Sequence, residues 1–172
     1  MPWPAARAAG VGDSASSMDA VSTWLSEVAD PGDELDELLR ARHLRRLADG
    51  FRWHGPAAVG SFDGGAAFVA GQQHPFRRSF SRRSAGSSVP GHRRVVHGSF
   101  GALVASGSWP ALAAAHTGSA WLGVPSSGRP VELRILDVYA VEDGRIGENW
   151  VMIDMVHALA QMGLDTGFDQ PC

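Results

Sequence analysis

Lysine is absent from this sequence: all 15 cationic side chains among its 172 residues are arginine. With the abundant alanine and glycine, this usage indicates a GC-rich, bacterial genome. Cysteine occurs once, as Cys172, which excludes an internal disulfide and fits a reducing cytoplasm. No cysteine and histidine cluster has zinc-site spacing, and no apolar run approaches the roughly 20 residues that span a bilayer. We therefore expect a cytoplasmic protein with no metal site and no membrane partner.

Six arginines form three pairs, Arg77-Arg78, Arg82-Arg83 and Arg93-Arg94, in and around a stretch rich in serine. Paired arginines can bind phosphate or nucleic acid. The formal charge is nevertheless −3, and neither a nucleic-acid motif nor a glycine-rich nucleotide loop accompanies the pairs. They are interpreted as a solvated loop, and no nucleic-acid partner is expected.

The order of patterns along the chain predicts an α+β domain over residues 17–165, with a disordered tail over 1–16 and a frayed end over 166–172. Helices are expected from Met18 to Asp30, over 33–50, over 66–74 up to a kink or end at Pro75, and over 156–162. The expected strands are 51–54, 94–98, 101–107, 111–121, 131–140 and 145–153, with Asp143-Gly144 as a hairpin turn. Ser16 and Ser17 are expected to cap the first helix, and Leu35, Leu38, Leu39 and Leu47 to form the buried stripe of the second. A curved, mostly antiparallel sheet wrapped by the N-terminal helices would enclose one pocket.

One carboxylate stands out in the expected strand 131–140. Alternate residues of a strand face opposite sides of the sheet, and Val131, Leu133, Ile135, Asp137 and Tyr139 form one set. Asp137 therefore shares an apolar face, where a carboxylate must be paired, protonated or chemically active. The structural alternatives are an ion pair with Arg134 or Arg129, or a position at the water-filled mouth of a pocket.

Three segments resemble the SnoaL-like polyketide cyclase family of the nuclear-transport-factor-2-like superfamily: WHGPAAVGSF, the run HTGSAWLGVPSSGRPVELRILDVYAVEDGRIGENW, and IDMVHALAQMGLD. The resemblance covers roughly residues 24–165. It implies an α+β cone, a homodimer, and a small apolar or polyketide-like ligand. It also implies cofactor-free ring closure by intramolecular aldol condensation, with the acid/base role on Asp137. Superfamily members also include isomerases and epoxide hydrolases, and a non-catalytic ligand-binding or dimerisation module is the rival interpretation.

Two histidines are candidate catalytic partners of Asp137. Abstraction of a proton next to a carbonyl needs a base and a donor for the developing enolate oxygen. His116 falls on the same alternate set as Ala114 and could supply that donor or orient the aspartate. His54, next to Trp53, has a similar case. Either histidine could instead be a hydrogen-bonded structural residue.

The candidate substrate-binding residues are Trp53, Trp121, Arg134, Tyr139 and Trp150. A tryptophan would offer a flat wall to a ring-shaped ligand, although large aromatic residues more often fill the core. Asp154 is expected to cap the last helix. The sequence departs from the family pattern at Arg82-Arg83, where a Pro-Asp pair is common, at Ser126-Ser127-Gly128, where Pro-Thr-Gly is common, and at Ala140. The departure at Arg82-Arg83 argues against a substrate contact from the loop that contains this pair.

Overall fold

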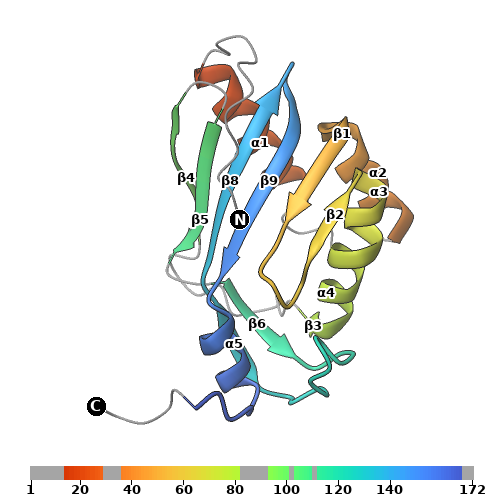
Figure 1. Ribbon diagram of the computed structural model, residues 1–172, viewed down its shortest axis with the longest axis vertical. Coiled ribbons are helices and arrows are strands. Elements are labelled where there is room, and N and C mark those ends of the chain that lie inside the picture. The colour runs from red at the N-terminus through yellow and green to blue at the C-terminus, as the bar shows by residue number, and fades with distance from the viewer. Residues whose placement is uncertain (1–13, 29–35, 82–92, 101–102, 110–111, 168–172) are drawn as a thin grey trace.

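Figure 1 shows the computed structural model, which describes residues 14–28, 36–81, 93–100, 103–109 and 112–167. The helices are α1 (Ser14–Val28), α2 (Asp36–Arg46), α3 (Gly65–Phe68), the π-helical segment η1 (Val69–Gln73), α4 (His74–Ser79) and α5 (Met155–Gln161). The strands are β1 (Leu47–His54), β2 (Ser61–Asp63), β3 (Phe80–Ser81), β4 (Arg93–Phe100), β5 (Leu103–Trp109), β6 (Leu112–His116), β7 (Pro130–Leu133), β8 (Ile135–Glu142) and β9 (Arg145–Ile153). This order confirms the predicted α+β class.

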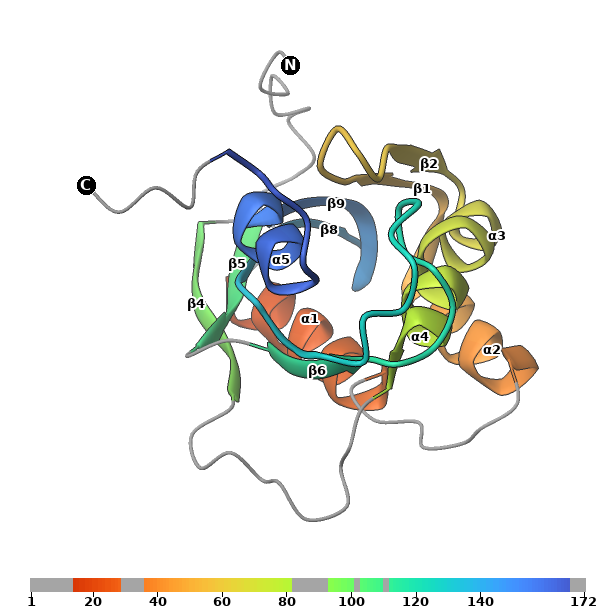
Figure 2. The ribbon, with the colours of Figure 1, turned by 90° about the horizontal axis from the view of Figure 1, so that it is seen from below.

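The main sheet has the strand order β2-β1-β9-β8-β5-β4. β1 and β9, which are far apart in the sequence, pair in parallel. The other pairings in this sheet are antiparallel. Register shifts at Val96/Gly98 and Ala140/Val141 interrupt the pairing, and such irregularities bend strands. The result is a curved, mixed sheet that does not close into a barrel (Figure 2).

A second sheet, with the order β3-β6-β7, lies at one end of the first. It is joined to the main sheet through the chain itself, because only Arg134 separates β7 from β8. The alternation predicted for 131–140 is confirmed across this junction: Val131, Leu133, Asp137 and Tyr139 are buried, whereas Glu132, Arg134 and Leu136 are exposed. One face of the bent strand therefore forms the interior.

The helices fill the concave side of the main sheet. In Figure 2, α1 lies inside the curve formed by β5, β8, β9 and β1, while α5 lies across one end of the molecule. Two apolar clusters result. The first joins α1, β1, α3, β8 and β9 around Trp24, Phe51 and Phe68, and the second joins β3, β6, β7 and α5 around Phe80, Trp121 and Met162. Burial of these large side chains is the main favourable term in folding.

The predicted hairpin turn and the predicted cap of the last helix are both confirmed. Asp143 and Gly144, with φ of 48° and 74°, form the tight hairpin between β8 and β9, the left-handed backbone that a type I′ turn requires. At the other end of β9, Asp154 Oδ1 accepts a hydrogen bond from the His157 amide at 3.1 Å and so caps α5.

The N-terminal half differs from the prediction in its boundaries. The first helix begins at Ser14, inside the expected tail, so Ser17 is a buried helical residue and not a cap. The rest of that tail, and residues 168–172, lie outside the described residues. Pro75 stands in the first turn of α4 directly after the π-helical segment η1, and the helical run continues through it from 65 to 79.

The predicted buried stripe of the second helix was also partly wrong. The helix stops at Arg46, and Leu47 is buried as the first residue of β1. Leu38 is exposed, and His43 takes the interior position on α2 instead. Arg45 and Arg46 lie on the side of α2 that faces α1, where both form ion pairs with Glu27.

Candidate functional site

Asp137 lies on the concave face of β8 and is 2% exposed. Its neighbours on that face are Ile135, which packs against the second apolar cluster, and Tyr139, which belongs to the first. The carboxylate therefore stands at the boundary between the two clusters. A charged group in such surroundings requires hydrogen-bond partners or a chemical task.

Asn149 supplies one of these partners. Its Nδ2 donates to Asp137 Oδ1 and to the Val138 carbonyl oxygen, both at 3.3 Å. Asn149 is 2% exposed and lies opposite Tyr139 in the β8 to β9 register, on the concave face. An amide that donates to one carboxylate oxygen fixes the orientation of the carboxyl group. Strand alternation alone places Asn149 on the face opposite Trp150, but it does not indicate the contact with Asp137.

His116 ends β6 and is fully buried. It shares a face with Ala114, which lies opposite Val131, and the same face of the bent β7 to β8 strand carries Asp137. The His116 ring lies against Phe80, with ring centroids 5.2 Å apart. His116 was expected to share a face with Ala114 and to point inward if that face does, and its ring is buried; its partnership with Asp137 remains a prediction.

The His116 ring is held from one side by Ser127. Its Nδ1 lies 3.3 Å from both the backbone N and the Oγ of Ser127. Its Nε2 is buried and has no hydrogen-bond partner among the residues that the structure describes. A buried polar nitrogen without a partner costs free energy, so Nε2 is the position on this ring where a ligand atom would be recognised.

His54 and Trp150 lie on the opposite, outer face of the sheet. They are register partners on β1 and β9, and their rings stack at 5.5 Å with planes 11° apart. His54 Nε2 is 3.3 Å from Glu148 Oε1, which also receives Arg52 Nη2 at 2.7 Å. Trp150 alternates with Asn149 and Val151, which face the concave side together with Asp137. His54 and Trp150 therefore lie on the other side of the sheet from Asp137. We therefore do not include them in the candidate site.

The other predicted binding residues are distributed differently. Trp53 is buried in the first cluster against Phe62 and Phe68, and Trp121 in the second against Phe80. Tyr139 is buried on the concave face next to Asp137. Arg134 is exposed, and its Nη1 lies 3.3 Å from Asp154 Oδ2 at the start of α5. Tyr139 alone of these residues shares β8 with Asp137, whereas Trp53 lies on the same concave face but on β1, opposite Asn149.

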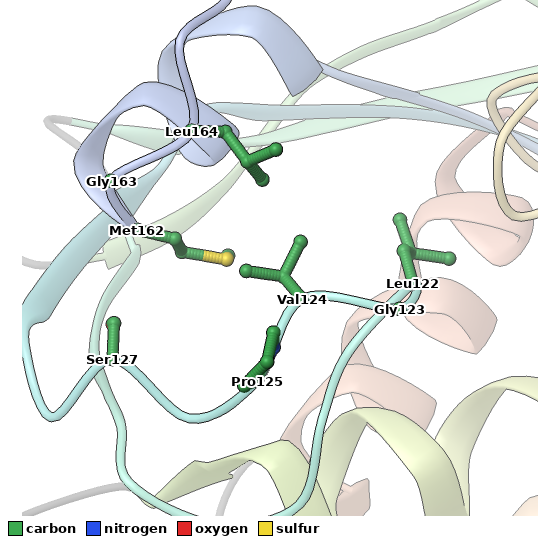
Figure 3. A pocket seen from close by; sticks show the side chains of 8 residues that line it. All are labelled: Leu122, Gly123, Val124, Pro125, Ser127, Met162, Gly163 and Leu164. Carbon is green, nitrogen blue, oxygen red and sulfur yellow. The ribbon is translucent and has the colours of Figure 1, made fainter.

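An open pocket of about 410 Å³ lies beside His116, between the loop after β6 and the end of α5. In Figure 3 the side chains of Leu122, Val124, Met162 and Leu164 point toward a common space. Ser127 also lines this pocket, so the residue that touches the His116 ring forms part of its wall. The lining is largely apolar and suits a hydrophobic ligand.

Within the described ranges, no three histidine, cysteine or acidic side chains are placed to hold a metal ion. The described helices also lack a segment with the length and apolar character required to cross a membrane.

The comparisons with known proteins agree with this architecture. Residues 97–162 match the family model described as SnoaL-like polyketide cyclase. No curated protein sequence matches the chain with significance.

Three solved structures illustrate the similarity. A proposed SnoaL-like polyketide cyclase from Jannaschia sp. CCS1 has a TM-score of 0.67 at 18% identity, covering 88% of this chain and 94% of that one. IdmH, a proposed polyketide cyclase from Streptomyces antibioticus, has a TM-score of 0.60 at 25% identity, covering 86% and 99%. An epoxide hydrolase of the LEH-like type from M. tuberculosis has a TM-score of 0.55 at 14% identity, covering 87% and 90%.

The fold and the buried carboxylate define an α+β protein of the nuclear-transport-factor-2-like class, whose curved sheet carries a polar group on its concave face. Over residues 97–162 the chain is similar to the SnoaL-like polyketide cyclase family, and its fold is that of SnoaL-like and related proteins. This similarity supports a small-molecule enzyme or binding protein, and the reaction has to be argued from the residues.

Proposed function

We propose that this protein is a cofactor-free enzyme that performs acid/base chemistry on an apolar, polyketide-like carbonyl compound, with Asp137 as the base. The observation that carries the proposal is the 2% exposed Asp137 carboxyl group on the concave face, oriented by the Asn149 amide. The fully buried His116, whose Nε2 lacks a partner in the described part of the chain, supports it.

Ring closure by aldol condensation is the first candidate reaction. The Asp137 carboxylate removes a proton from a carbon next to a carbonyl, and the His116 Nε2–H donates a hydrogen bond to the enolate oxygen that forms. The enolate carbon then attacks a second carbonyl of the same molecule, forming a carbon–carbon bond. The resulting alkoxide takes the proton back from Asp137, so no atom is gained or lost. The names of IdmH and the Jannaschia protein favour this reaction.

Epoxide opening by water is the second candidate, favoured by the fold shared with the LEH-like epoxide hydrolase. Asp137 would then activate water, with no enolate to stabilise. Isomerisation would use the same proton abstraction as the aldol reaction. A non-catalytic ligand-binding module on this fold is the rival of a different class.

Proton exchange provides a direct test, because it isolates the first step. We expect the protein to accelerate exchange of the α-protons of 2-tetralone, an apolar bicyclic ketone, in D₂O. Asp137→Asn should abolish the acceleration, while Glu142→Gln, an exposed carboxylate on the same strand, should not change it. Equal rates for the wild type and Asp137→Asn would refute the assignment of the base.

The small molecule that copurifies with the protein would separate the enzyme from the module. Native mass spectrometry should detect it, and incubation with fresh protein should convert it if the protein is an enzyme. A copurified molecule that wild-type protein binds but never alters would favour the binding module. We further propose a cytoplasmic location, because a chain with a single cysteine needs no oxidising compartment to form a disulfide.

We also propose that the protein is a homodimer formed through the outer face of the main sheet. Leu136 and Met152 lie directly opposite each other there, 39% and 53% exposed, next to the paired Val138 and Trp150. On the same face, the charges of Arg52 and Glu148 compensate each other in an ion pair, so this described pair adds no net charge to the surface. A self-complementary surface of this kind suits a two-fold interface.

A further inference from the structure

The hydrogen atoms around His116 can be assigned from donor chemistry alone. A backbone N–H can only donate, so the contact from Ser127 N to His116 Nδ1 requires Nδ1 to be an acceptor. The Arg129 amide likewise donates to Ser127 Oγ at 3.3 Å, which leaves the Ser127 hydroxyl hydrogen available for Nδ1. Both contacts favour the same neutral form of the ring, in which Nδ1 is bare and Nε2 carries the proton.

The segment 126–129 also fixes the His116 backbone. Ser126 Oγ and the Gly128 amide donate to the His116 carbonyl oxygen at 3.0 and 2.8 Å, and the His116 amide donates to the Arg129 carbonyl oxygen at 2.9 Å. These bonds fix the position of the His116 backbone against the loop, and the ring itself is held by its two contacts with Ser127. Its Nε2 edge is buried beside Phe80 without a partner in the described residues.

We propose that Ser127 is a positioning residue that holds His116 as a fixed Nε2–H donor for a carbonyl or enolate oxygen of the ligand. Its action on a ligand rests on the proposed function, whereas its effect on the ring does not. The proposal assigns His116 to hydrogen-bond donation and leaves proton abstraction to Asp137. The ligand that fits presents an oxygen acceptor, and not an acidic proton, to this end of the site. Ser127 also lines the pocket beside α5. A ligand in that pocket would therefore contact the same residue that holds the His116 ring.

Nuclear magnetic resonance of the full chain labelled with ¹⁵N-histidine tests the assignment without any substrate. His116→Gln identifies the His116 signals. At about pH 8, above the usual pKa range of histidine, we expect a protonated Nε2 and an unprotonated Nδ1 in the wild type. A protonated Nδ1 in the wild type would overturn the proposal.

Two adjacent serines provide a matched pair of variants. Ser127→Ala removes the hydroxyl that contacts the ring, whereas Ser126→Ala removes one that contacts only the backbone carbonyl of His116. Ser127→Ala keeps the backbone N–H of residue 127 and removes only the hydroxyl contact, so we expect a partial increase of the Nδ1–H form. Ser126→Ala should leave the ring signals in place, and Ser127→Thr should restore the wild-type signals. Equal perturbation by both alanine variants would reduce Ser127 to a structural loop residue and overturn the proposal.

The α-proton exchange assay then measures the consequence for chemistry. Ser127→Ala should lower kcat on the order of ten-fold with a smaller change in KM, while Ser126→Ala stays within about two-fold. Retention of full activity by Ser127→Ala, with the shifted ring signals, would overturn the donor role. A wild type that shows the expected ring signals but no exchange activity would refute the proposed function alone.

Discussion

The imidazole of His43 meets the indole of Trp24 edge-on in the core between α1 and α2, with ring centroids 5.7 Å apart and planes 70° apart. Phe68 meets the other side of the imidazole at 5.6 Å. Neither His43 nitrogen has a hydrogen-bond partner among the described residues, and the side chain is 1% exposed. Burial, with smaller effects from the nearby Arg77 and His74, lowers the pKa of His43 from 6.5 to about 4.

This pKa predicts acid-sensitive stability. The native state keeps His43 neutral down to about pH 4, whereas the unfolded chain takes up a proton near pH 6.5. The free energy of unfolding is therefore unaffected by His43 above pH 6.5 and decreases between pH 6.5 and about 4. The loss amounts to about 3 kcal/mol. His43→Leu should remove this fall, because the substituted side chain cannot be protonated.

Urea unfolding of the wild type and His43→Leu at about pH 7 and pH 4.5 measures the difference. His54→Gln is the control, since His54 is partly exposed on the outer face and already lies beside Glu148. A His43→Leu protein that loses as much stability as the wild type on acidification would contradict the prediction.

Asn149 should act on the chemistry only through Asp137. Asn149→Ala removes the amide that donates to Oδ1, so the carboxyl group loses its fixed orientation. We expect α-proton exchange to fall about ten-fold, with about 2 kcal/mol lost in unfolding free energy for a buried hydrogen bond to a charged group.

A double-mutant cycle on the unfolding free energy checks the contact between the two side chains. In the Asp137→Asn background, Asn149→Ala should cost less unfolding free energy than in the wild type, because the charged acceptor of the Asn149 amide is gone. Additive losses of unfolding free energy in the double variant would show that Asn149 acts independently of Asp137.

The outer sheet face should control the oligomeric state. Met152→Glu places a charge next to Leu136, and in a two-fold interface it is introduced in both copies. We expect a dimer for the wild type and a monomer for this variant by size-exclusion chromatography with light scattering. Leu38→Glu, an exposed apolar residue on α2, is the control and should remain dimeric. A wild-type monomer, or a dimer that survives Met152→Glu, would refute the proposed interface.

Strand alternation explains which parts of the site were predictable. The interior position of Asp137 could be predicted because residues 131–139 alternate between two faces, and the face opposite Asp137 carries the charged residues Glu132 and Arg134. The same rule applied to β1 indicates that Trp53 and His54 cannot both face inward, and Trp53 is the buried one. The contact of Ser127 with His116 depends on how a loop folds back over a strand, and no periodicity encodes it. His43 was missed because leucines were assigned to the buried face of its helix.

Gly118, in the H-T-G segment that resembles the cyclase family, should be structurally indispensable. A Cβ added there would lie 1.7 Å from the Arg78 carbonyl oxygen and 2.8 Å from its carbonyl carbon. These are backbone atoms at the end of α4, where the Gly118 and Ser119 amides donate to the Ser79 and Arg78 carbonyl oxygens at 3.1 and 2.8 Å, so they cannot move aside cheaply.

Gly118→Ala should therefore cost about 3 kcal/mol or more of unfolding free energy in urea. Gly50→Ala is the matched control, since a Cβ there meets nothing within 4 Å, and it should change stability by less than about 1 kcal/mol. Equal stability of the two variants would mean that β6 can move away from α4. His116, two residues before Gly118, would then not be held in place by this contact. If Gly118→Ala is strongly destabilised, the two residues of the segment have separate roles. The His116 ring faces the ligand, and Gly118 allows the close approach to α4 that keeps His116 in position.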